Sequence, residues 1–115
     1  MHICFEDLPV VPLDQFYGGK GCLRAAMHQD SQIKIMHGTL PPNCSIGQHR
    51  HWTSSELIYV LSGTATISFD DITEVVTAGQ CHYCPVGHRH AMRNNGETDL
   101  QFIAVVPEQC HLREV

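Results

Sequence analysis

Short runs of alternating apolar and polar residues recur along the chain, and clusters of Gly, Pro, Asn and Asp separate them. Alternation with a period of two is typical of a strand that buries one face. No stretch has the period of an amphipathic helix. The close spacing of short strands and turns is that of an antiparallel sandwich or barrel. The expected strands are 31–39, 57–62, 64–69, 72–76, 81–84 and 100–106.

The chain is long enough for one domain and too short for two. Its 115 residues are 43% apolar, which is enough for a single core. Pro9, Pro12 and Gly18-Gly19 break any regular pattern near the start. We therefore expect residues 1–22 to form an N-terminal arm or edge strand and residues 23–115 to form the all-β barrel domain.

Charge and hydropathy exclude two classes of partner. The formal net charge is -5, and the basic residues are scattered singly, so we expect no nucleic-acid binding. No apolar run approaches the length of a membrane span, so we expect no membrane association. The acidic N-terminal residues Glu6 and Asp7 stand where a signal peptide has a basic leader. These observations predict a cytoplasmic protein.

Six cysteines raise the alternative of a disulfide framework. That interpretation needs a secreted context, which the N-terminal sequence does not supply. Cys81 and Cys84 have the spacing of half a zinc knuckle, but residues three apart in a strand point to opposite faces, and no second pair completes the set. We expect free, mostly buried thiols, with these two in the core or pocket wall.

Four residues have the chemistry of metal ligands. In a strand, His49 and His51 project from the same face, and Glu56 follows the polar turn after them. A hairpin would bring Glu56 opposite these histidines, and His90 would come from a distant strand across the barrel. Three imidazoles and one carboxylate suit a single divalent transition ion (Mn, Fe, Co, Ni, Cu or Zn) and leave two of six coordination positions open.

The spacing around these residues resembles a known family. His49-X-His51-X4-Glu56-X6-Gly63 resembles the first conserved motif of the cupin superfamily. Gly79-X5-Pro85-X-Gly87-X2-His90-X3-Asn94 matches its second motif at every defined position. The resemblance is to small bacterial single-domain cupins and implies a jelly-roll β-barrel, also called a double-stranded β-helix. It also implies that His49, His51, Glu56 and His90 bind the metal.

One position departs from the first motif, which usually begins with glycine where this chain has Asn43. Asparagine is among the residues that best tolerate the left-handed backbone conformation. We therefore expect the turn at Pro42-Asn43 to keep its shape.

Function has to be inferred from the site, because this fold carries many activities. The first hypothesis is a metalloenzyme, of dioxygenase, isomerase or lyase type, acting on a small polar molecule that chelates the metal. The alternative is a non-catalytic binding or sensing module for a small carboxylate or sugar-like ligand. A catalytic base would discriminate between them, and His88, His82 and Tyr59 are the candidates.

Strand parity predicts what surrounds the site. Ile58 and Val60 should share the inward face of Glu56, and Met92 and Asn94 that of His90. Leu57 and Leu61 should then point outward. Exposed apolar positions and strand edges favour pairing with a second copy, so we expect a homodimer.

Overall fold

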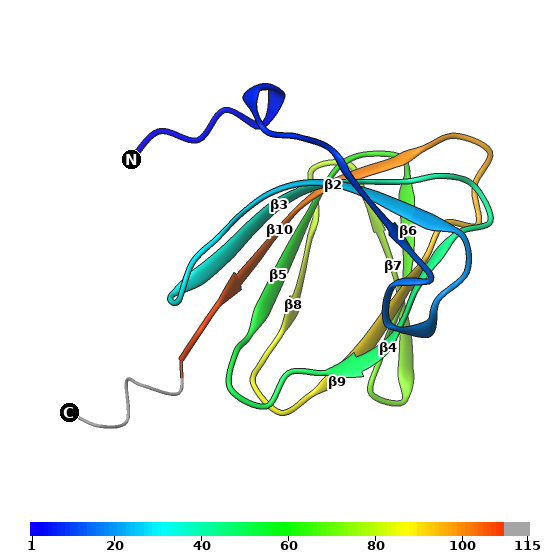
Figure 1. Ribbon diagram of the computed structural model, residues 1–115. Coiled ribbons are helices and arrows are strands. Elements are labelled where there is room, and N and C mark those ends of the chain that lie inside the picture. The colour runs from blue at the N-terminus through cyan, green and yellow to red at the C-terminus, as the bar shows by residue number, and fades with distance from the viewer. Residues whose placement is uncertain (110–115) are drawn as a thin grey trace.

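The computed structural model describes residues 1–109, and it is built almost entirely of short strands (Figure 1). The strand bounds are β1 Val11–Asp14, β2 Cys22–Gln29, β3 Ile33–Leu40, β4 Ser45–Arg50, β5 Glu56–Ser62, β6 Thr64–Phe69, β7 Ile72–Thr77, β8 Cys81–Cys84, β9 Arg89–Arg93 and β10 Leu100–Pro107. Two single-turn 3-10 helices, η1 (Phe5–Asp7) and η2 (Phe16–Gly18), flank β1. No helix in this part of the chain is long and apolar enough to cross a membrane.

The strands form two antiparallel sheets that face each other, as expected for a jelly roll. One sheet has the order β1-β2-β3-β10-β5-β8 and the other β4-β9-β6-β7. The six strand ranges predicted from alternation all correspond to observed strands. The pattern did not predict β2, in which the neighbouring residues Ala25 and Ala26 are both buried and interrupt the alternation.

The core lies between the inner faces of the two sheets. Ile58, Val60 and Met92 are buried as strand parity predicted, while Leu57 is exposed. A Cβ on Gly38 would lie 2.4 Å from a ring carbon of Phe102, so the glycine makes room for the largest fully buried side chain. The interior is therefore filled, and the site occupies one end of it.

Asn43 adopts the left-handed conformation, with φ of 65°. Its N–H donates to the carbonyl of Asn94. The expectation that asparagine would replace the glycine of the first motif without loss of the turn is confirmed.

The side chain of Asn94 connects the end of β9 to two neighbouring segments through hydrogen bonds. Its side chain is 1% exposed, and its amide donates to the carbonyls of Leu40 and Thr98, each at 2.8 Å. Its carboxamide oxygen accepts from the N–H of Gly96 at 2.9 Å. A single buried side chain thus satisfies three backbone groups near the strand that carries His90.

We predict that Asn94→Ala lowers the free energy of unfolding by roughly 2–4 kcal/mol, because it leaves buried backbone groups unpaired. The adjacent Asn95 is exposed and makes one longer contact, 3.3 Å to Thr66 Oγ1. Asn95→Ala should therefore change the stability by no more than about 0.5 kcal/mol. Urea denaturation of both variants measures the difference, and equal midpoints would contradict the framework role of Asn94.

Candidate metal centre

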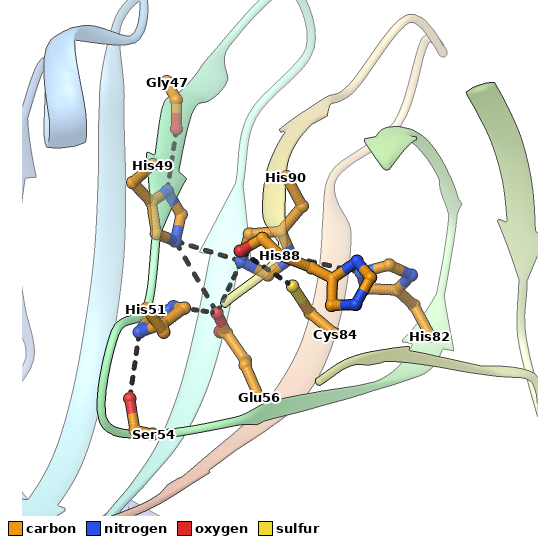
Figure 2. Close-up of polar contacts among 9 residues, drawn as sticks. All are labelled: Gly47, His49, His51, Ser54, Glu56, His82, Cys84, His88 and His90. Carbon is orange, nitrogen blue, oxygen red and sulfur yellow. Dashed lines mark hydrogen bonds and ion pairs between the residues drawn. The ribbon is translucent and has the colours of Figure 1, made fainter. Parts of the chain in front are cut away.

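Four side chains from both sheets converge at one end of the barrel (Figure 2). His49 lies near the end of β4, and His51 follows that strand directly. His90 lies on β9, and Glu56 begins β5 in the opposite sheet. Glu56 and His90 are buried, and the side chains of His49 and His51 are each 11% exposed. The structure thus brings together all four residues that the sequence selected.

The route by which they meet differs from the one expected. His90 does not come from across the barrel, since β9 is the hydrogen-bonded neighbour of β4 and His49 and His90 are direct register partners. Glu56 does not lie on a hairpin with the histidines, since the turn after His51 carries the chain from one sheet to the other. Alternation along a strand predicts which face of the sheet a residue occupies, but it does not predict which strands are neighbours. Both errors arise because the order of the strands was not known from the sequence.

The distances between the four potential ligand atoms are those of donors around one ion. Glu56 Oε1 lies 2.8 Å from His90 Nε2, 3.0 Å from His51 Nε2 and 3.7 Å from His49 Nε2. The Nε2 atoms of His49 and His90 are 3.0 Å apart. Neighbouring ligands on an ion with bonds of about 2.1 Å are separated by roughly 3.0–3.4 Å. The cluster therefore can hold one divalent ion.

The opposite nitrogens of these rings are held by other groups. His49 Nδ1 donates to the carbonyl of Gly47 at 2.9 Å. His51 Nδ1 lies 3.1 Å from Ser54 Oγ, and His90 Nδ1 lies 3.0 Å from His82 Nε2. A carbonyl can only accept, so the neutral ring of His49 presents an Nε2 lone pair to the cluster. Lone pairs and a carboxylate at this distance repel one another unless a proton or a metal ion lies between them.

Glu56 supplies the negative charge of the cluster. Burial alone would raise the pKa of its carboxyl group, but the contacts with His49, His51 and His90 outweigh burial and hold the pKa well below its usual value. The carboxylate is therefore ionised at neutral pH and is available as an oxygen ligand.

The 3-10 helix η2 covers the site, which sequence reasoning did not predict. The ring of Tyr17 stacks on that of His49, with centroids 3.9 Å apart and planes at 13°. Tyr17 has a left-handed backbone with φ of 53°, so its neighbours must hold it in place. A Cβ on Gly47 would lie 2.0 Å from the carbonyl oxygen of Tyr17, so glycine lets η2 approach β4 closely. The Gly18-Gly19 break was the only signal of this cap.

A small pocket opens beside the four residues. Its free volume is about 20 Å³, roughly the room that one or two water molecules need. Apart from the four residues, Tyr17 and Lys34 are its only polar lining side chains among the described residues. Burial, together with the charge of Glu56, raises the pKa of the Tyr17 hydroxyl, so it keeps its proton. The apolar wall consists of Phe16, Met36, Ile46, Ile58, Ala91 and Met92.

The three candidates for a catalytic base do not line this pocket. Tyr59 lies on the outer face of β5 and is 41% exposed. The His88 side chain is 44% exposed and pairs with Asp70 at 2.6 Å. His82 is buried behind His90, and burial lowers its pKa despite the opposing effect of Glu74.

The five described cysteines are free, as expected, but they are not mostly buried. Cys84 is fully buried, while Cys4 and Cys81 are exposed. The prediction of a core or pocket-wall position is therefore wrong for Cys81, because it lies on the outer face of β8. Cys110 lies outside the described residues.

Two similar proteins differ greatly in length. An oxalate-binding protein of Thermotoga maritima is 31% identical over 96 residues, which cover 77% of this chain and 78% of that protein. The alginate biosynthesis protein AlgA of Pseudomonas putida is 31% identical over 74 residues, which cover 64% of this chain but only 15% of that protein.

Solved structures share the fold. That of a predicted oxalate decarboxylase from Thermotoga maritima has a TM-score of 0.88 at 25% identity and covers 94% of this chain and 99% of its own. An RmlC-like cupin from Shewanella frigidimarina has a TM-score of 0.78 at 18% identity, covering 94% and 91%.

The family model of the cupin domain matches residues 36–106, which is more than half of the chain and includes all four convergent residues. The two sequence motifs, the two facing sheets and this match all indicate the same family. The chain belongs to the cupin family.

Proposed function

We propose that His49, His51, Glu56 and His90 bind one divalent transition-metal ion. The observation that carries this proposal is the approach of three imidazole nitrogens and one ionised carboxylate within 4.8 Å of one another. Nitrogen-rich donor sets suit Mn, Fe, Co, Ni, Cu or Zn better than Ca or Mg. Such an ion would act as a Lewis acid toward a ligand that coordinates it.

The purified protein should carry close to one transition-metal ion per chain, and His49→Ala and His90→Ala should remove most of it. Each substitution deletes one of only four donors and opens a buried site to water. His28→Ala is the matched control, because His28 lies on β2 and pairs with Asp30. Elemental analysis measures the content, and equal content in all four proteins would refute this site.

The ligand of this ion is, in our proposal, a small carboxylate. A divalent ion beside a single carboxylate leaves a net positive charge, and Lys34 adds a second cation to the pocket wall. Tyr17 supplies a hydroxyl donor. The similarity to an oxalate-binding protein supports the same class of ligand.

Metal-loaded protein should bind oxalate and other short dicarboxylates, and metal-free protein should not. Lys34→Gln should weaken binding by roughly tenfold or more, because it removes a charged donor. Lys20→Gln removes an exposed lysine that does not line this pocket and should leave the affinity unchanged. Titration calorimetry measures the binding, and equal affinities for carboxylates and neutral diols would contradict an anion site.

Turnover of the bound ligand is the second candidate function. It is favoured by Tyr17 and Lys34, which face the pocket and can donate protons to a ligand held there. Product analysis of the same metal-loaded mixtures separates the two functions. Conversion that Tyr17→Phe slows by a larger factor than it weakens binding indicates an enzyme of lyase, isomerase or dioxygenase type, and binding without conversion indicates a binding module.

We also propose a homodimer formed through the outer face of the six-stranded sheet. Leu57, Tyr59 and Leu61 on β5 are each at least 40% exposed, and Tyr83 on β8 is 58% exposed. Leu57 and Tyr83 are cross-strand partners, so these side chains form one continuous apolar surface. A contiguous apolar surface of this kind is typical of an interface between protein subunits.

Light scattering at micromolar concentration should give twice the chain mass of 12.9 kDa. Tyr59→Glu should give monomers, since it places a charge within the apolar surface. Val75→Glu is the control, because Val75 is equally apolar and exposed but lies on β7 of the other sheet. A monomeric wild type, or dissociation by both variants, would exclude this interface.

A further inference from the structure

Three side chains form a line from the barrel edge to the metal centre. Glu74 Oε1 on β7 lies 2.9 Å from His82 Nδ1 on β8, and His82 Nε2 lies 3.0 Å from His90 Nδ1 on β9. Figure 2 shows His82 on the side of His90 that is away from His49, with a dashed line for the contact between their rings. The Glu74 side chain is 40% exposed, whereas that of His82 is 1% exposed. The line thus begins at the surface and ends at a buried ligand.

The contacts determine where each proton lies. A carboxylate oxygen accepts, so the His82 ring donates from Nδ1 to Glu74. A neutral imidazole has one N–H, so His82 Nε2 accepts, and the partner that donates to it is His90 Nδ1. In the neutral ring of His90 the lone pair is then on Nε2, the nitrogen that lies 2.8 Å from Glu56 Oε1.

The same region offers an alternative, because His82, Cys84 and His90 also lie close enough to hold a metal. A second ion there would need the thiolate of Cys84 and would compete for His90. Burial raises the pKa of the Cys84 thiol to about 11, and its Sγ lies 3.6 Å from the carbonyl of His88 as a donor. The cluster therefore fits a chain of hydrogen bonds better than a second metal site.

We infer that Glu74 and His82 are positioning residues that fix His90 in the tautomer and orientation required for metal binding through Nε2. The inference rests on the proposed metal site. Partners of this kind both orient a ligand histidine and increase its basicity, and their loss weakens metal binding by roughly 10–100-fold. Neither residue belongs to the defined positions of the two cupin motifs quoted above.

Three variants separate the contributions in the zinc-loaded protein. His82→Phe removes the acceptor for His90 and should raise the zinc dissociation constant by roughly 10–100-fold. His82→Gln retains an acceptor oxygen and should restore most of the affinity. Glu74→Gln retains the hydrogen bond but removes the charge, so its effect should be smaller than that of His82→Phe. His28→Phe, which alters a histidine–carboxylate pair elsewhere, should have no effect.

Chelator competition measures the dissociation constants, and it distinguishes two kinds of failure. If the wild type binds no zinc, the proposed metal site is wrong and the inference falls with it. If the wild type and His82→Phe bind zinc equally, the metal site stands and the positioning role is overturned.

Nitrogen-15 NMR of the imidazole rings tests the inference in the unmodified zinc-loaded protein, without reliance on variants that fold poorly. The expected spectrum has protons on Nδ1 of both His82 and His90. A proton on Nε2 of His82 would reverse the direction of the two hydrogen bonds that His82 makes, and this result would overturn the proposal.

Discussion

The candidate site depends on one buried negative charge that lies among three imidazole rings. Glu56 is buried and ionised, and the ring nitrogens nearest to it are those not used by backbone or neighbouring side chains. Repulsion among donors so close together is relieved only by a proton or a metal ion. The surrounding framework, including Gly47, Ser54 and His82, holds the rings in this arrangement. Fixed rings of this kind are what the proposed metal site requires.

The two sheets are joined at both of their open seams by groups that also contact the candidate site. Between the edge strands β7 and β8, the Glu74–His82 hydrogen bond crosses from one sheet to the other. On the far side, η2 packs on the edge strand β4 through the close approach of Tyr17 and Gly47. Barrel closure and ligand geometry therefore share residues. A substitution that disrupts either seam should alter the positions of the site histidines through direct contacts rather than through a general loss of stability.

Much of the site could be predicted because motif spacing and strand parity are local properties. His49, His51, Glu56 and His90 were identified together, and the alternation around Ile58 correctly separated inward from outward positions. Strand order is not local, so the sequence did not indicate that β4 and β9 are neighbours or that Glu56 comes from the opposite sheet.

Contacts between distant segments were also missed. Nothing in the sequence links Tyr17 to His49 or Glu74 to His82, because these pairs arise only when the barrel closes. The left-handed backbone of Tyr17 could not be predicted from the sequence either, since tyrosine has no preference for this conformation.

The cap formed by η2 has a kinetic consequence. Tyr17 lies flat against a ring that faces the ion position, and the pocket beside it has room for only one or two water molecules. Movement of this segment away from β4 would widen that opening. The rate at which a bound ion exchanges with solvent would then depend on the motion of a short N-terminal segment as well as on the bonds to the four ligands.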